Sequence, residues 1–182
     1  MQALATALSG VLLLEPKVFG DERGFFFESW NARRFAELTG CTQPFVQDNH
    51  SRSARGVLRG LHYQLPPKAQ GKLVRVVAGE ILDVVVDLRR SSATFGRWNS
   101  EVLSAANKRQ LWIPPGFAHG FLVRSESAEV EYKVTDFYAP EAEACIRWDE
   151  PQLAIDWGLQ GPPVLSAKDR AGGTFAAATA FA

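Results

Sequence analysis

The sequence of 182 residues has little cysteine and no excess of charge of either sign. Its two cysteines, Cys41 and Cys145, are too few for a disulfide framework and lack metal-ligand spacing, so we expect a reducing compartment. The 20 basic and 20 acidic residues cancel, which argues against nucleic acid or an anionic membrane as a partner. Residues 3–14 are apolar but too short to span a bilayer and follow no basic residue, so we predict a first strand there and a cytoplasmic protein.

Short segments of strand length dominate the chain, with Gly, Pro, Asn and Ser between them, which predicts an all-β sandwich or barrel. The expected strands cover residues 11–14, 24–28, 57–65, 73–77, 81–88, 101–103, 110–113, 120–123 and 129–138. The tripeptide Ala78-Gly79-Glu80 predicts a tight link between two of them. Residues 30–39 have helical spacing and end at Gly40, which favours one short helix. We predict a single domain over residues 1–182, with a loosely ordered Gly/Ala-rich tail at 171–182.

A basic block lies between residues 49 and 79, where the chain has six Lys or Arg and no Asp or Glu. Such a block in a neutral protein points to a small anion, for example a phosphate. Within it, residues 56–64 form a strand-like run that contains Arg59 and His62. Strict alternation puts these two side chains on opposite faces, so they share a site only if the strand bulges or twists, for which Gly60 is the plausible place.

One of the three histidines lies in a short motif, Pro114-x-Gly116-x-x-His119. This motif resembles the second motif of the cupin superfamily, whose members are small jelly-roll β-barrels. Metal-binding cupins add a His-x-His pair, because a divalent metal needs three or four converging ligands. Here the corresponding place reads His62-Tyr63-Gln64, so we expect no metal site, and a metal-dependent cupin oxygenase becomes a disfavoured alternative.

Without a metal, three side chains form a set suited to enolisation. An imidazole, with a reference pKa of about 6.5, can accept a proton at neutral pH, whereas a tyrosine, at about 10, supplies one. Alternation in residues 129–134 points Tyr132 inward, so His62 and Tyr132 make a base and acid couple, and Lys72 offers a fixed cation for an enolate oxygen. Taken singly, each has a plainer interpretation: a bonded core histidine, a core aromatic and a solvated lysine.

Seven segments, in order along the chain, carry a family resemblance. They are residues 19–24 with Phe26 and Glu28, and residues 45–51, 56–64, 70–74, 83–89, 113–121 and 165–169. Together they resemble the dTDP-4-dehydrorhamnose 3,5-epimerases, metal-free enzymes of deoxysugar biosynthesis, over nearly the whole chain. The resemblance implies a cupin-type jelly-roll β-barrel with a few short helices, and an enzyme that uses no cofactor and no metal.

The resemblance also implies roles for individual residues. His62 is similar to the family's base, Asp169 to the carboxylate that orients its imidazole, Tyr132 to the acid on the opposite face, and Lys72 to the lysine at the C4 oxygen. The remaining residues match family positions that bind the substrate: Arg23, Phe26, Glu28, Gln47, Asn49, Arg59, His119, Tyr138, Glu143 and Lys168. Among them, Tyr138 and Phe26 are available to stack on the base. The plainer interpretation of Glu143 is a solvated acid in an acidic loop.

The expected activity is epimerisation at C3 and C5 of dTDP-4-keto-6-deoxyglucose to give dTDP-4-keto-L-rhamnose. A mono-epimerase acting at C3 or C5 alone, and a non-catalytic cupin that binds nucleotide sugars, are the alternatives. Family members are commonly homodimers with an exchanged N-terminal strand, which would bring Arg23 and Glu28 across the interface to the neighbouring chain's His62.

Overall fold

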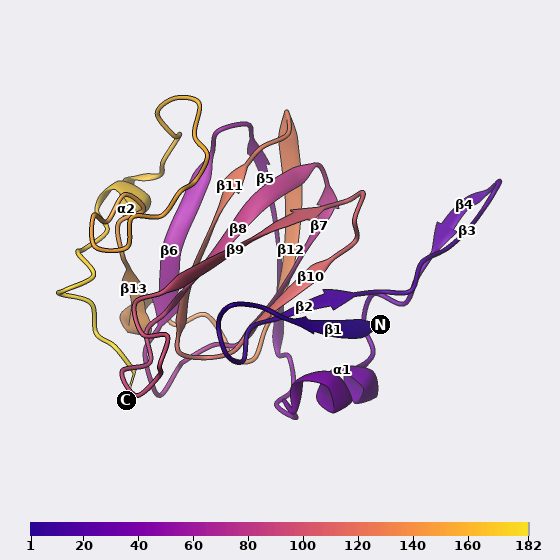
Figure 1. The fold of residues 1–182 in the computed structure, drawn as a ribbon, viewed down its shortest axis with the longest axis horizontal. Coiled ribbons are helices and arrows are strands. Elements are labelled where there is room, and N and C mark those ends of the chain that lie inside the picture. Colours follow the sequence, from indigo (N-terminus) through magenta and orange to yellow (C-terminus); the bar gives the residue numbers. More distant parts are fainter. Residues whose placement is uncertain (182) are drawn as a thin grey trace.

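Two antiparallel β-sheets face each other and enclose an apolar cluster of buried side chains (Figure 1). The computed structural model describes residues 1–181. The six-stranded sheet has the spatial order β1 (Gln2–Ala5), β2 (Leu12–Glu15), β10 (Gln110–Ile113), β7 (Lys72–Ala78), β12 (Ser127–Val134) and β5 (Gln47–Ala54). The five-stranded sheet has the order β13 (Glu143–Cys145), β6 (Leu58–Gln64), β11 (Phe117–Val123), β8 (Glu80–Asp87) and β9 (Trp98–Ser104). The predicted all-β fold is confirmed.

The strands depart from the sequence prediction at several places, among them the short strands at residues 19–21 and 143–145, which were not predicted. Two departures matter most for the fold. Residues 3–14 form not one strand but two, β1 and β2, which pair in antiparallel fashion; the chain reverses through Gly10, whose φ of +92° suits glycine. The second departure is β5, which the sequence analysis missed because residues 47–54 are almost entirely polar. This strand pairs with β12 along its whole length, and its residues alternate between part-buried and exposed.

The predicted tight link at residues 78–80 connects the two sheets. β7 ends at Ala78 in the six-stranded sheet and β8 begins at Glu80 in the five-stranded one. Gly79 has φ +76°, and a Cβ there would lie 2.0 Å from the backbone oxygen of Ser127. A glycine is therefore required where the chain crosses between the layers.

Short helices lie at the edges of the barrel. α1 (Ala32–Thr39) begins two residues later than predicted, where the Asn31 side chain accepts a hydrogen bond from Arg34 N, and it ends at Gly40 with φ +72°. Its buried Phe35 packs against Trp112 of β10. The 3₁₀ turn η1 (Pro140–Ala142) precedes β13, and α2 (Ala167–Arg170) lies beside β6. No helix within residues 1–181 has the length and apolarity needed to cross a membrane.

A second apolar cluster covers the outer face of the five-stranded sheet. Strand β8 is buried on both faces. Ile81 and Val85 belong to the cluster between the sheets, and Val84 and Val86 belong to the second cluster, which includes residues of the C-terminal segments. The tail contributes to this cover. Phe181 exchanges backbone hydrogen bonds with residues 88 and 90, and residue 175 packs on the cluster. The loose order expected from the composition of residues 171–182 stays a prediction. Residue 182 of the predicted tail lies outside the described residues.

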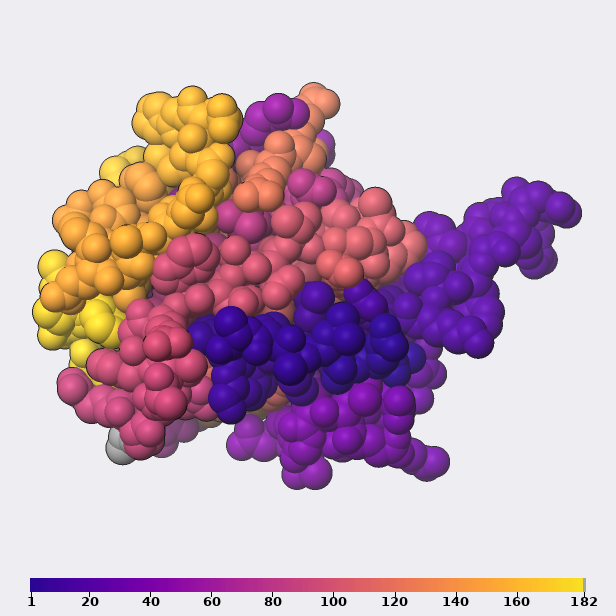
Figure 2. Space-filling model, in the orientation of Figure 1, coloured from indigo at the N-terminus to yellow at the C-terminus, as the bar shows by residue number. Residues whose placement is uncertain are grey.

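A two-stranded hairpin, β3 (Phe19–Asp21) and β4 (Gly24–Phe26), projects from the body as an arm (Figures 1 and 2). We call residues 19–26 the arm. It exposes apolar rings to an unusual degree: Phe25 is 62% exposed and Phe26 is 69% exposed. Exposed apolar patches of this kind mark surfaces that bind a partner.

Candidate active site

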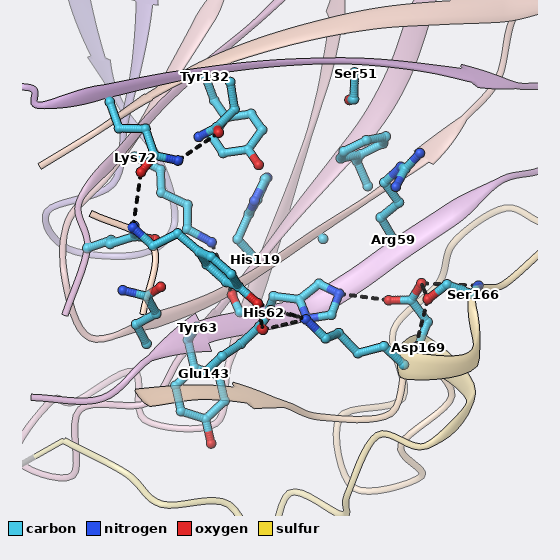
Figure 3. Close-up of a pocket in the computed structure, with 18 residues that line it drawn as sticks. Ser51, Arg59, His62, Tyr63, Lys72, His119, Tyr132, Glu143, Ser166 and Asp169 are labelled. Carbon is cyan, nitrogen blue, oxygen red and sulfur yellow. Dashed lines mark hydrogen bonds and ion pairs between the residues drawn. The ribbon is translucent and has the colours of Figure 1, made fainter. Parts of the chain in front are cut away.

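A cavity of about 430 Å³ opens between the two sheets (Figure 3). It is lined by side chains from strands of both sheets and from α2. It brings together most of the residues that the sequence analysis selected, namely Gln47, Asn49, Arg59, His62, Lys72, His119, Tyr132, Tyr138, Glu143, Lys168 and Asp169. Three selected residues are elsewhere in this chain: Arg23 and Phe26 belong to the arm, and Glu28 follows it.

A β-bulge in β6 brings Arg59 and His62 to the same face. In the pairing with β11, His119 is opposite His62 and Phe121 is opposite Arg59, so two residues of β6 face one residue of β11. The extra residue lies at Gly60, which has φ +124° and no room for a side chain: a Cβ would lie 2.5 Å from the Gly120 Cα. The hypothesis of a bulge at Gly60 is confirmed.

The bulge also reverses the faces that strict alternation predicts for the rest of β6. Beyond it, Leu61 and Tyr63 point outward and join the second apolar cluster, together with Leu58 from before the bulge. His62 then points into the cavity with Arg59, rather than sharing a face with Leu58. One inserted residue therefore converts a strand with mixed faces into a polar inner wall and an apolar outer one.

Asp169 holds the imidazole of His62. The Asp169 Oδ1 atom lies 2.7 Å from His62 Nε2 and also accepts a hydrogen bond from Gly60 N at 3.0 Å. Its Oδ2 atom accepts one from the Ser166 hydroxyl at 2.6 Å, within a capping box that begins α2. Burial alone would raise the pKa of Asp169, but these hydrogen bonds outweigh it and hold the pKa well below its usual range.

The ionised Asp169 decides which nitrogen of His62 carries the proton. A carboxylate only accepts hydrogen bonds, so Nε2 must donate, and in the neutral ring Nδ1 then has a free lone pair. Nδ1 is buried and has no hydrogen-bond partner among residues 1–181; the nearest acidic oxygen, on Glu143, is 3.6 Å away. The side chain is 23% exposed and lines the cavity, and Nδ1 is the ring nitrogen that remains able to accept a proton.

Tyr132 and Lys72 come from the opposite sheet. They lie on the neighbouring strands β12 and β7, so they face His62 across the cavity (Figure 3). Burial raises the pKa of Tyr132 despite the nearby positive charge of Arg59, which keeps the phenol protonated and able to donate. Burial also lowers the pKa of Lys72 to about 8, against the opposing charges of Asp83 and Glu143. Lys72 Nζ donates to the backbone oxygen of His62 at 3.3 Å.

A second histidine–aspartate pair lies beside the first. His119 is directly opposite His62 in the β6–β11 ladder, and its Nε2 lies 2.9 and 3.0 Å from the two carboxylate oxygens of Asp83 on β8. Both side chains are buried. The sequence analysis missed the role of Asp83 as the partner of His119, although an acid within the apolar run of residues 81–88 is a signal for a buried bonded group.

Hydrogen-bond donors for an anion lie along β5 and β6. Both the Nε and the Nη2 atoms of Arg59 donate to the Ser53 hydroxyl, at 3.1 and 3.0 Å. On β5, in the other sheet, the Gln47 amide donates to the Asn49 side chain at 2.8 Å. A guanidinium fixed by a neutral hydroxyl keeps its positive charge uncompensated, which suits a phosphate group.

At the exposed mouth of the cavity, Glu143 joins two of the selected residues. Its Oε2 accepts hydrogen bonds from the Tyr138 hydroxyl, at 2.7 Å, and from the ammonium group of Lys168. Burial raises the pKa of Glu143, but these bonds outweigh it, so that its pKa lies below the usual value. Glu143 is thus a bonded part of the cavity wall, not the freely solvated loop acid of the plainer interpretation.

Cys145 contributes a thiol next to the His62 and Asp169 pair. Within residues 1–181, these three residues offer ligand atoms that all lie within 4.8 Å of one another, a distance at which a metal ion can be held. Burial raises the pKa of Cys145 to about 11, with the charges of Asp169 and Glu143 adding to the effect, so the thiol is protonated at neutral pH. The sequence analysis did not find this cluster, because Cys145 is far from the other two residues along the chain.

The fold and the cavity together define a class of protein, the jelly-roll barrels of cupin type, here with a histidine and a tyrosine entering from opposite walls. A family model described as dTDP-4-dehydrorhamnose 3,5-epimerase matches residues 5–177. The chain belongs to the dTDP-4-dehydrorhamnose 3,5-epimerase family.

Individual relatives agree with this membership. The chain is 64% identical over 181 residues to the dTDP-4-dehydrorhamnose 3,5-epimerase of Pseudomonas aeruginosa, covering 100% of this chain and 99% of that protein. It is 57% identical over 171 residues to the enzyme of the same name from Salmonella typhimurium, covering 94% and 93%. The crystal structure of a dTDP-6-deoxy-D-glucose-3,5-epimerase from Legionella pneumophila, in complex with dTDP-4-keto-L-rhamnose, superposes with a TM-score of 0.94 at 54% identity, covering 97% and 93%. The predicted family and fold class are confirmed.

Proposed function

We propose that this protein catalyses the epimerisation of dTDP-4-keto-6-deoxyglucose at C3 and C5 to give dTDP-4-keto-L-rhamnose, a step of dTDP-L-rhamnose biosynthesis. The observation that carries the proposal is the placement of His62 and Tyr132 on opposite walls of one cavity. Inversion at a carbon atom requires proton removal on one face and proton delivery on the other. A site with base and acid on one side would only return the proton to the face it came from.

In the proposed mechanism, Nδ1 of His62 removes the proton from the carbon next to the C4 ketone. The electron pair of the broken C–H bond moves to the C4 oxygen, and the ammonium group of Lys72 stabilises the negative charge there. The Tyr132 hydroxyl delivers a proton to the other face of the same carbon. The ionised Asp169 stabilises the imidazolium form of His62, which afterwards loses its proton to solvent while the tyrosinate of Tyr132 regains one from solvent. One C–H bond breaks and one forms, so the step needs no oxidant and no cofactor.

The remaining cavity residues bind the nucleotide in this proposal. Arg59 provides paired N–H donors for the diphosphate, and the half-exposed ring of Tyr138 at the mouth offers a surface for the thymine base. Gln47, Asn49, Glu143, His119 and Lys168 complete the polar lining. The proposed enzyme acts as a single domain over residues 1–182 in the cytoplasm, which agrees with two cysteines that are both free thiols.

We also propose a homodimer in which the arm reaches the neighbouring chain's cavity. The arm carries Arg23 and the exposed Phe26 away from the cavity of its own chain, and Glu28 lies just beyond it. Within residues 1–181, Arg23 pairs only with its neighbour Asp21. An exchanged arm would cover the exposed rings and supply a further cation for the diphosphate.

Mixing two inactive variants tests the exchange. Arg23→Ala and His62→Asn chains should each be inactive as pure dimers, but subunit exchange creates one site that has both His62 and a partner's Arg23. Recovery of activity in the mixture supports the exchanged arm. No recovery, with heterodimers shown by native mass spectrometry, would place Arg23 in the same site as its own His62 or outside it.

The activity is tested by solvent exchange. The protein, treated with a chelator, is incubated with dTDP-4-keto-6-deoxyglucose in deuterium oxide, and proton NMR follows deuterium entry at C3 and C5. Exchange at both carbons, with the product reduced to dTDP-L-rhamnose by an added reductase, is the expected result. Exchange at one carbon would show a mono-epimerase, and no exchange would leave a non-catalytic binding protein. His50→Asn is the matched control, because His50 is exposed and pairs with Glu129 outside the cavity.

A further inference from the structure

The mechanism proposed above gives no role to the half-buried thiol of Cys145, which lies beside the proposed base. Strand β13 places Cys145 directly opposite His62 in its pairing with β6. The ligand atoms of Cys145, His62 and Asp169 all lie within 4.8 Å of one another. Two of the three already share a hydrogen bond of 2.7 Å between His62 Nε2 and Asp169 Oδ1.

The three donors match the preferences of a soft or borderline divalent cation. Thiolate, imidazole and carboxylate are the ligands that hold Zn²⁺ in proteins, and three protein ligands leave a fourth position for water. Zinc bonds of about 2.0–2.3 Å place the ligand atoms of a tetrahedral site roughly 3.3–3.8 Å apart. The present separations therefore need only small side-chain rotations. A carboxylate oxygen of Glu143, 3.6 Å from His62 Nδ1, adds negative charge next to the cluster.

We propose that His62, Cys145 and Asp169 form an inhibitory binding site for a thiophilic divalent cation of the Zn²⁺ type. The cation takes the Nε2 lone pair, an oxygen of the carboxylate and the sulfur; the ring proton moves from Nε2 to Nδ1, and the thiol proton passes to solvent. No group changes its oxidation state. Binding of the cation does not depend on the proposed epimerase activity, whereas inhibition rests on it, because a metal-bound His62 is no longer available as the base.

Cobalt absorption tests the site directly. Co²⁺ is added to the chelator-treated protein, and the expected result is a near-ultraviolet charge-transfer band from a thiolate bound to cobalt, together with the visible bands of a tetrahedral ion. The Cys145→Ser variant should lose the charge-transfer band. The matched control, Cys41→Ser, should keep it, since Cys41 packs in the cluster around α1. Absence of the band in the unmodified protein, or its loss in the Cys41→Ser variant alone, would overturn the proposal.

Competition and inhibition provide the second test. Zn²⁺ should displace Co²⁺ from the unmodified protein. Cys145→Ser should weaken Zn²⁺ binding by at least about tenfold, because removing a residue that only supports a metal ligand already costs that much, and Cys145 is a ligand itself. In the deuterium exchange assay, Zn²⁺ should stop exchange in the unmodified protein and act only at about tenfold higher concentration on Cys145→Ser. Mg²⁺ should do neither. Equal sensitivity of the two proteins to Zn²⁺ would contradict the proposal.

The two proposals fail in distinguishable ways. If the protein without metal shows no exchange at C3 or C5, the proposed function is wrong, and the cobalt spectrum still decides the metal site. If exchange occurs normally and cobalt gives no thiolate band, only the metal site is wrong.

Discussion

Two histidine–aspartate pairs lie side by side in this barrel, and they differ in what their surroundings leave free. His119 and Asp83 belong to adjacent strands of one sheet, and their side chains are 9% and 0% exposed. His62 is directly opposite His119, but its partner Asp169 comes from a short helix more than a hundred residues along the chain. The His62 side chain is 23% exposed and keeps Nδ1 unbonded. The same two residue types thus form a fixed part of the cavity wall in one place and, in the proposed mechanism, the base in the other.

The difference originates in the backbone. Between β8 and β11 the ladder is regular through His119, whereas between β6 and β11 it is interrupted by the bulge at Gly60. The bulge turns His62 inward, and the Gly60 amide donates a hydrogen bond to Asp169. Asp169 can therefore fix the ring through Nε2 and leave Nδ1 without a bond in the part of the chain that the structure describes. Four predictions test this contrast, from the largest expected effect to the smallest.

The first prediction compares the two histidines. His62→Asn should lower deuterium exchange at C3 and C5 by about 10²–10⁴-fold, because the general base is removed. His119→Asn should reduce the rate by about tenfold to a hundredfold, as expected for the loss of one hydrogen bond to a charged group. NMR exchange rates at saturating substrate give both values. Equal losses in the two variants would remove the distinction between base and wall.

The second prediction compares the two aspartates. Asp169→Asn should lower exchange by about a hundredfold or more, because an amide can donate to Nε2 and so favour the wrong tautomer of His62. Asp83→Asn should cost about tenfold or less. Circular dichroism checks that both variants are folded. If Asp83→Asn proved the more damaging of the two in a folded protein, the assignment of roles would be reversed.

The third prediction concerns the bulge. Gly60→Ala should lower the free energy of unfolding by about 1–3 kcal/mol, because the added Cβ meets the backbone of Gly120 and residue 119. It should also reduce deuterium exchange at C3 and C5, since the His62 ring would be displaced from its position in the cavity. Gly161→Ala is the matched control, as its Cβ would meet nothing within 4 Å. Urea denaturation measures the stability of both variants, and the deuterium assay measures their exchange rates. Unchanged stability and activity in Gly60→Ala would show that the bulge is not required.

The fourth prediction is a pH dependence from Lys72. Its pKa of about 8 means that the ammonium form is present below that pH and is lost as the pH rises through it. Exchange should therefore fall on the alkaline side of pH 8, approaching about tenfold for each further pH unit. In Lys72→Arg, the residual activity should lack this alkaline limb, because a guanidinium does not titrate there. An identical limb in both proteins would assign it to another group.

The sequence was sufficient to predict the all-β fold, the helix ending at Gly40 and the membership of most cavity residues. It did not reveal β5, because a strand of polar residues has no apolar alternation. Nor did it reveal that Asp83 faces His119 or that Cys145 faces His62, since both contacts arise from strand pairing between distant segments. The shared face of Arg59 and His62 was predicted only conditionally. It depends on a one-residue insertion in a ladder, and Gly60 is the single residue that marks it.

The most direct test of the account is the tautomer of His62. Long-range ¹⁵N–¹H NMR on protein labelled at histidine resolves the three rings, and His50→Asn, His62→Asn and His119→Asn assign them. The account predicts that the neutral ring of His62 carries its proton on Nε2 and has an unprotonated Nδ1 facing the cavity. A neutral ring with the proton on Nδ1 would contradict it, because the nitrogen that faces the substrate could then no longer act as the base.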